Sequence, residues 1–263
     1  MNIHFYKYQG TGNDFVMIDN RDENFPKNNQ KLVAFLCHRR FGIGADGLIL
    51  LENAEGYDFR MVYYNSDGKE SSMCGNGGRC TVAFAKQLGI ISDKTHFIAT
   101  DGEHSAQINA QNEVQLQMKN VEAIQVEQDY VFLDTGSPHH VQVVDNVGEI
   151  DVNTEGAKIR YGELYKDKGG SNVNFVSQQN ENTFNIRTYE RGVEGETYSC
   201  GTGATAVAIS MYHLGKTNSK EVHLQTLGGN LKVLFERKDK GYENVHLCGT
   251  ATFVFEGDCE VKV

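Results

Sequence analysis

The sequence is poor in several features that would point to particular protein classes. It has only two prolines, Pro26 and Pro138, and no stretch rich in Pro, Gly or Ser that would mark a linker. No run approaches the ~18 consecutive apolar residues that a membrane-spanning helix needs. The N-terminus is typical of a strand and lacks the basic segment and apolar core of a signal peptide. These absences predict a soluble, cytoplasmic protein without a membrane partner.

A surplus of positive charge is also missing. Lys and Arg number 25 against 35 Asp and Glu, a net charge of −10. An acidic surface repels phosphate backbones, so we expect no nucleic-acid partner. A zwitterionic amino acid is compatible with such a surface. The six cysteines include no C-x-x-C pair, so we expect no zinc or other metal site and assign the thiols to packing or catalysis.

The chain is organised as a duplication. Cys74-Gly-Asn-Gly and Cys200-Gly-Thr-Gly are each followed by an apolar run that ends in Leu-Gly, and the two motifs are 126 residues apart (74 and 200). Other residues repeat at the same spacing, among them Glu70 and Glu196. A repeated unit of this kind predicts two similar domains. We expect residues 1–122 to carry Cys74 and residues 123–263 to carry Cys200, with the C-terminal residues as candidates to pack back on the first half.

Most segments between these markers alternate in the manner of strands, for example 59–64, 114–118, 184–189 and 231–235. Only three segments favour helix: the two runs that follow the cysteines and residues 30–40. The runs after the cysteines are apolar on nearly every side, which indicates burial, and Gly89 and Gly215 suit their C-terminal caps. We therefore predict an α+β fold with two pseudo-symmetric domains. Each is a curved, mostly antiparallel, barrel-like sheet around a central buried helix, with the active site in the cleft between them.

A cysteine just before a glycine-rich helix start has distinctive chemistry. The first amides of a helix have no internal partners and bind anions such as carboxylates. The same field stabilises a thiolate, so we expect a lowered pKa for such a thiol. Two such cysteines on opposite sides of one α-carbon could remove a proton from one face and return one to the other. The remaining cysteines have no such context and are assigned to the core or the surface: Cys37, Cys80, Cys248 and Cys259.

Short motifs along nearly the whole chain resemble those of the diaminopimelate epimerase family. They are GTGNDF at 10–15, GIGADG at 42–47, NSDG at 65–68, MCGNGGR at 73–79, PH at 138–139, NVNF at 172–175, YERG at 189–192 and CGTG at 200–203.

The resemblance implies a cofactor-independent isomerase that interconverts LL- and meso-2,6-diaminopimelate in lysine and peptidoglycan-precursor biosynthesis. It implies that Cys74 and Cys200 are the acid/base pair and that a homodimer forms. His139 and Glu190 are expected to tune or orient the thiols. The residues expected to bind substrate are Asn13, Asn65, Gly75, Asn76, Asn172, Glu190, Arg191, Gly201 and Thr202.

Some residues of these motifs are expected to act differently. Asp14, Asp46 and Asp67 are assigned to the support of glycine turns. Ser137 occupies a position where the family commonly has Asn, and its shorter hydroxyl could reach substrate only through water, so it is left out of the predicted site.

Other functions remain open at this point. A relative of the same fold that acts on proline or hydroxyproline is the main alternative within the enzyme class, although Glu190, Arg191 and Asn172 favour a substrate charged at both ends. The segment from Gly201 to Ala206 matches a loose dinucleotide fingerprint but lacks the acidic residue that should follow. A non-catalytic binding protein would have little use for both cysteines.

Overall fold

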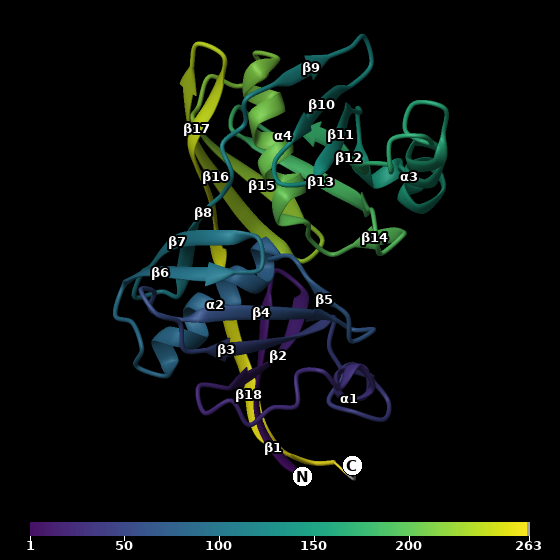
Figure 1. Cartoon of the computed structure of the whole chain (residues 1–263). Helices are drawn as coiled ribbons and strands as arrows, with labels where there is room; N and C mark the ends of the chain where they lie inside the picture. Colours follow the sequence, from purple (N-terminus) through teal and green to yellow (C-terminus); the bar gives the residue numbers. More distant parts are fainter. Residues whose placement is uncertain (262–263) are drawn as a thin grey trace. The chain divides into compact units, whose positions relative to one another are not determined.

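A computed structural model describes residues 1–261 and divides the chain into two compact units. Among the described residues, unit 1 comprises residues 1–116 and 249–261, and unit 2 comprises residues 117–248. Each unit contains its own strands and one central helix (Figure 1).

Unit 1 is a mostly antiparallel sheet with two parallel pairings. Strand β1 pairs antiparallel with β2, β2 pairs parallel with β3, and β3 pairs antiparallel with β4. Strand β4 then pairs parallel with β6, β6 pairs antiparallel with β7, and β7 pairs antiparallel with β8. Strand β18 pairs antiparallel with the other edge of β1. The strands are β1 (Asn2–Gly10), β2 (Asn13–Asp19), β3 (Gly47–Glu52), β4 (Arg60–Asn65), β5 (Glu70–Ser71), β6 (Lys94–Ala99), β7 (Gly102–Ile108), β8 (Glu113–Gln117), which runs past the unit boundary, and β18 (Thr252–Glu260).

Unit 2 repeats this order of pairings. Strand β10 pairs antiparallel with β11, β11 pairs parallel with β12, and β12 pairs antiparallel with β13. Strand β13 then pairs parallel with β15, β15 pairs antiparallel with β16, and β16 pairs antiparallel with β17. The α+β repeat predicted from the sequence is therefore confirmed. The strands are β9 (Ile124–Val126), β10 (Val131–Asp134), β11 (Pro138–Val143), β12 (Asn172–Gln178), β13 (Thr183–Glu190), β14 (Gly195–Thr197), β15 (Glu221–Thr226), β16 (Gly229–Lys238) and β17 (Gly241–Thr250), the last of which also crosses the unit boundary.

The central helices are α2 (Gly75–Gln87) in unit 1 and α4 (Gly201–His213) in unit 2. Figure 1 shows each of them among the strands of its own unit. Most of their side chains are small or apolar, so ten or more residues of each helix are buried, and in α2 the buried residues include the charged Arg79. Both end as predicted, with Gly89 at φ 70° and Gly215 at φ 69°, a left-handed conformation that glycine adopts without steric cost.

The prediction of a helix at residues 30–40 was partly wrong. Helix α1 (Gln30–Cys37) is shorter and ends at His38, whose backbone is extended. The N–H groups of Ile43 and Gly44 both donate to the carbonyl of Leu36 and fold the following loop back on the helix. This tertiary loop, rather than the local propensity of Arg39 and Arg40, sets the helix end.

A further helix, α3 (Val152–Tyr161), follows the short 3-10 turn η1 (Val147–Glu149) and was not predicted. Asp151 caps its start by accepting a hydrogen bond from the Thr154 N–H. Gly156 obscures the signal, because glycine is a poor helix former. A Cβ at this position would lie only 2.4 Å from the Cβ of Tyr189, so glycine is needed for α3 to pack on β13.

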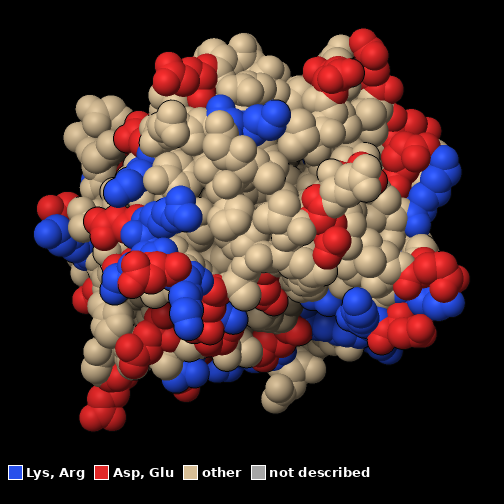
Figure 2. Space-filling view, turned by 90° about the horizontal axis from the view of Figure 1, so that it is seen from above, with Lys and Arg blue, Asp and Glu red and all other residues tan. Residues whose placement is uncertain are grey.

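Charged side chains are mixed on the surface shown in Figure 2. Lys and Arg alternate with Asp and Glu around a broad area without charge, so this face has no continuous basic track. Within residues 1–261, no helix is both long and apolar enough to cross a membrane.

Candidate active site

Both predicted catalytic cysteines occupy the residue that precedes a central helix. Cys74 is the N-cap of α2 and Cys200 is the N-cap of α4, and both have an extended backbone. The following residues, Gly75 and Asn76 in one unit and Gly201 and Thr202 in the other, form the first helical turns. Their amide groups are among those that a helix leaves for an external acceptor.

In unit 1, the structure brings Cys74, Asn13 and Asn76 together. The Cys74 thiol lies 3.6 Å from Asn13 Oδ1, which accepts its hydrogen bond. The Asn76 Nδ2 lies 3.4 Å from the same oxygen. Asn13 Oδ1 therefore accepts from both side chains, and one amide oxygen holds Cys74 and Asn76 together.

The Asn13 side chain is held by an ionic network. Its Nδ2 donates to Asp46 Oδ2 at 2.7 Å, and Arg39 binds the other oxygen of Asp46 at 2.7 Å. Arg39 and Lys7 also bind Asp14. Burial opposes ionisation of Asp14, but these hydrogen bonds outweigh it and lower its pKa to about 2.

The network adds to one sequence-based assignment. Asp67 supports a turn, since it accepts a hydrogen bond from the Lys69 N–H at 3.0 Å. Asp14 and Asp46 each accept the backbone N–H of the other, and they also form ion pairs with Arg39, while Asp46 binds the side chain of a predicted site residue. Sequence spacing could not show this, because Asn13 and Asp46 are brought together only by the parallel pairing of β2 with β3.

Asn65 is the last residue of β4 and is exposed. Its carbonyl accepts from the Gly68 N–H and its N–H donates to Lys69, so its backbone closes a turn. Asn65 pairs with Gly47, which pairs in turn with Phe15 on β2. It therefore lies at the same end of the unit 1 sheet as Asn13.

In unit 2, Cys200 is 8% exposed and is surrounded by hydrogen-bonding groups. Its sulfur accepts from the Gly203 N–H at 3.4 Å and lies 3.5 Å from the Thr202 hydroxyl. Burial and the negative charge of Glu190 nevertheless raise the Cys200 pKa well above its ordinary value. The lowered pKa expected at a helix start was therefore wrong for Cys200, because desolvation and a neighbouring carboxylate outweigh the helix amides.

His139 is completely buried on β11 beside Asn174 of β12. The Asn174 Nδ2 lies 3.1 Å from His139 Nδ1. Burial, together with the positive charge of Arg191, lowers the pKa of His139 to about 3, so the ring is neutral near pH 7. The Nε2 atom of His139 is buried and has no hydrogen-bond partner within residues 1–261.

The Asn172 side chain forms hydrogen bonds with Ser137, Pro138 and Arg191. Its Nδ2 donates to the Ser137 hydroxyl at 2.9 Å and to the Pro138 carbonyl at 3.0 Å, while its Oδ1 accepts from the Arg191 N–H at 2.9 Å. The Arg191 guanidinium reaches Ser137 at 3.4 Å. Asn172 thus holds the backbone of Arg191, and Ser137, which was left out of the predicted site, lies within it.

Thr202 is tied to the strand region by its backbone. The Thr135 hydroxyl donates to the Thr202 carbonyl at 2.9 Å and fixes the start of α4 against the end of β10.

The site residues that the sequence analysis did not predict are Asp46, Ser137 and Asn174. A signal for Asn174 existed, because Asn172 and Asn174 are two apart on one strand and therefore face the same side.

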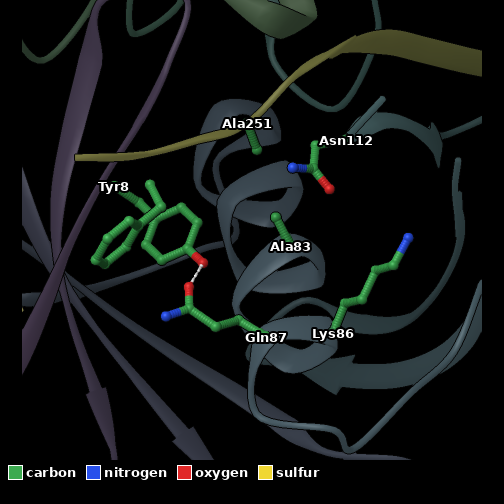
Figure 3. A pocket seen from close by; sticks show the side chains of 7 residues that line it. Tyr8, Ala83, Lys86, Gln87, Asn112 and Ala251 are labelled. Carbon is green, nitrogen blue, oxygen red and sulfur yellow. Dashed lines mark hydrogen bonds between the residues drawn. The ribbon is translucent and has the colours of Figure 1, made fainter. Parts of the chain in front are cut away.

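Unit 1 also has a cavity of about 260 Å³ (Figure 3). It is lined by Tyr8, Ala83, Lys86, Gln87, Asn112, Ala251 and Phe253. Figure 3 shows the Tyr8 hydroxyl bonded to Gln87 at one side and the Lys86 amine at the other. None of the predicted site residues lines this cavity. No cluster of His, Cys, Asp and Glu suitable for a metal ion occurs within residues 1–261.

A family model and a sequence relative that match this chain belong to the same family. The diaminopimelate epimerase family model matches residues 5–124 and 131–254. The diaminopimelate epimerase of Flavobacterium psychrophilum is 62% identical over 251 residues, which cover 95% of this chain and 98% of the relative.

Solved structures share the fold at low sequence identity. A phenazine biosynthesis protein of the PhzF family from Bacillus anthracis superposes with a TM-score of 0.78 at 14% identity, covering 99% of this chain and 100% of its own. A probable proline racemase from Agrobacterium radiobacter K84 gives a TM-score of 0.68 at 16% identity, covering 99% and 93%. These two likenesses establish the fold, and the close sequence relative distinguishes among its families. The chain belongs to the diaminopimelate epimerase family.

Proposed function

We propose that this protein interconverts LL- and meso-2,6-diaminopimelate with Cys74 and Cys200 as its two acid/base groups, in lysine and peptidoglycan-precursor biosynthesis. The observation that carries the proposal is the repeated placement of one cysteine at the start of the central helix in each unit. Family membership supports the substrate.

The chemistry exchanges one α-proton for another on the opposite face. One cysteine removes the proton as a thiolate, and the other delivers a proton as a thiol. The transition state places negative charge on the α-carboxylate. Backbone amides near Gly75 and Asn76 and near Gly201 and Thr202 are suited to bind that charge, because helix-start donors need no reorganisation during the reaction. The mechanism needs no pyridoxal phosphate or metal ion.

Glu190 is the proposed proton partner of Cys200. The raised pKa of Cys200 and its hydrogen bond with Glu190 favour a resting thiol. When Cys200 must act as the base, the nearby carboxylate can take up its proton. Because the two thiols exchange protonation states in each turnover, they titrate as a coupled pair in the working enzyme.

The distal end of the substrate is the proposed ligand of Arg191, Asn172 and Glu190, with Asn13 and Asn65 as further polar contacts. A guanidinium binds a carboxylate through two donors, and a carboxylate binds an ammonium. The contact between Arg191 and Ser137 adds a hydroxyl to this group. A substrate without a charged distal end, such as proline, would leave these groups without their ligand.

The proposal is tested by incubation of each diaminopimelate stereoisomer with the protein in deuterated water. We expect α-deuterium incorporation together with interconversion of the LL and meso forms, measured by mass spectrometry and chiral chromatography. Proline and hydroxyproline serve as matched alternative substrates. Racemisation of proline with no exchange into diaminopimelate would contradict the assigned substrate.

We also propose that the protein is a cytoplasmic homodimer. Three adjacent apolar side chains on β18 support self-association, since Phe253, Val254 and Phe255 are 41%, 51% and 45% exposed. Six free thiols suit a reducing compartment. Sedimentation equilibrium should give twice the chain mass, and Phe255→Glu should shift the protein to the monomer. A monomeric wild-type protein at micromolar concentration would contradict the homodimer.

A further inference from the structure

Asn174 is a fully buried asparagine that the proposed reaction does not use. It lies on β12, with its amide directed at β11 and β13. Its Nδ2 is 3.1 Å from His139 Nδ1 and 3.0 Å from the His140 carbonyl. Its Oδ1 accepts from the Thr188 hydroxyl at 3.0 Å. All of its polar atoms therefore have partners.

These contacts determine which way the amide points. The His140 carbonyl can only accept a hydrogen bond, so the Asn174 atom that faces it must be the NH₂ group. The same NH₂ group faces His139 Nδ1, which must therefore be an acceptor. A neutral imidazole that accepts at Nδ1 carries its proton on Nε2.

We propose that Asn174 is a positioning residue that fixes His139 as the Nε2–H tautomer and so presents a hydrogen-bond donor to the reacting groups. The proposal rests on the proposed function and on the expectation, implied by the family resemblance, that His139 tunes or orients a thiol. The Nε2 atom is buried and has no partner within residues 1–261, which leaves its N–H for a ligand. An anionic acceptor in the site would complete this hydrogen bond.

A second contact links Asn174 to the cysteine motif. A Cβ built on Gly203 would lie 2.4 Å from Asn174 Oδ1. Gly203 also donates its N–H to the Cys200 sulfur. The last glycine of the Cys200-Gly-Thr-Gly motif is therefore required by the position of Asn174. The Asn174 amide thus contacts the His139 ring through Nδ2 and leaves room only for glycine at position 203 of α4 through Oδ1.

The test begins with wild-type protein labelled with ¹⁵N-histidine. Long-range ¹H–¹⁵N NMR spectra report which ring nitrogen is protonated, and the His139 signals are assigned by their loss in His139→Gln. We expect a neutral ring with the proton on Nε2 at pH 7. A proton on Nδ1 in the wild type would overturn the proposal without any variant having to fold.

Asn174→Asp replaces the NH₂ group that faces His139 Nδ1 and also donates to the His140 carbonyl. Its carboxylate oxygen accepts where the amide donated, so we expect a proton on His139 Nδ1 and a fall in kcat of about tenfold or more, with a smaller change in KM. Asn185→Asp is the matched control on β13, because the same substitution there lies outside this network; it should keep the wild-type tautomer and kcat. An Asn174→Asp protein with wild-type kcat, or with Nε2 still the sole protonated ring nitrogen, would overturn the proposal.

This experiment distinguishes a failure of the proposed function from a failure of the Asn174 assignment. If the wild-type protein fails to epimerise diaminopimelate while His139 is the Nε2–H tautomer, the proposed function fails and the assignment of Asn174 stands. If the wild type epimerises and its His139 carries the proton on Nδ1, the assignment of Asn174 fails alone.

Discussion

The N–H of Gly203 donates to the sulfur of Cys200 at 3.4 Å, so this cysteine caps its own helix. Cys74 occupies the equivalent position on α2 without a side-chain cap and directs its thiol to Asn13 instead. The duplicated motif therefore provides two different thiol environments. In the proposed reaction each of these two cysteines must serve in turn as base and as acid.

Cys74→Ala and Cys200→Ala should each abolish epimerisation, because one face of the α-carbon then lacks its proton carrier. Both side chains are small and lie at helix starts, so each substitution should reduce the free energy of unfolding by only about 1 kcal/mol. Chiral chromatography of the products and urea unfolding measure the two effects. Wild-type turnover in either variant would exclude the two-base mechanism.

Glu190→Gln should make Cys200 ionise at lower pH. The Glu190 carboxylate raises the Cys200 pKa by its charge and its hydrogen bond, and glutamine removes the charge while burial remains. Alkylation by iodoacetamide requires the thiolate, so the rate at Cys200 should rise at a lower pH in the variant than in the wild type. Peptide mass spectrometry measures this rate, with Cys259 of unit 1 as the internal reference. An unchanged pH profile at Cys200 would show that Glu190 does not control its ionisation.

Gly203→Ala should be far more damaging than Gly77→Ala, although the two glycines occupy equivalent positions in α4 and α2. The new Cβ at 203 would lie 2.4 Å from Asn174 Oδ1, within a fixed hydrogen-bond network. At position 77 the nearest atoms are the flexible ends of Ile49 and Met61, at 3.1 and 3.3 Å.

Overpacking costs about 1–3 kcal/mol, whereas alanine in a helix interior gains up to about 1 kcal/mol over glycine. Thermal unfolding of both variants measures the difference. Equal stability of the two would mean that Asn174 can move freely.

The sequence contained enough to predict the repeat, the two central helices and the cysteines at their starts, because each is encoded locally by spacing, apolar pattern and glycine caps. The end of α1 and the existence of α3 depend on tertiary contacts that mask or override local propensity. The roles of Asp46 and Asn174 arise only when β2 pairs with β3 and β11 with β12. Strand pairing brings together residues more than 30 positions apart, and no local pattern specifies which polar atoms then meet.

Arg191→Lys should impair turnover although it keeps the positive charge. A guanidinium can donate two parallel hydrogen bonds to a carboxylate, while an ammonium acts as a point charge. Steady-state kinetics with diaminopimelate should therefore show a raised KM and a lower kcat/KM. Arg237→Lys is a control for the same substitution at a residue outside the proposed site. If Arg191→Lys retained a near-normal kcat/KM, the assignment of Arg191 to the distal carboxylate would be wrong.

Acidification should destabilise the fold through the two adjacent buried histidines. Burial lowers the pKa of His139 to about 3 and that of His140 to about 4, from an ordinary value near 6.5. Below pH 6.5 the unfolded chain binds protons that the folded chain excludes, so the free energy of unfolding falls as pH decreases. Between pH 7 and pH 5 the loss is about 2 kcal/mol for each histidine.

Urea unfolding at both pH values measures this loss. In His139→Gln the difference between pH 7 and pH 5 should shrink by about 2 kcal/mol, whatever the stability of the variant at pH 7. His223→Gln is the matched control, because that side chain is 49% exposed and its ring already meets water in the folded protein. The control should keep the wild-type pH dependence. A His139→Gln protein with the full wild-type difference would mean that the His139 ring accepts a proton in the folded state, and its neutral role in the site would have to be abandoned.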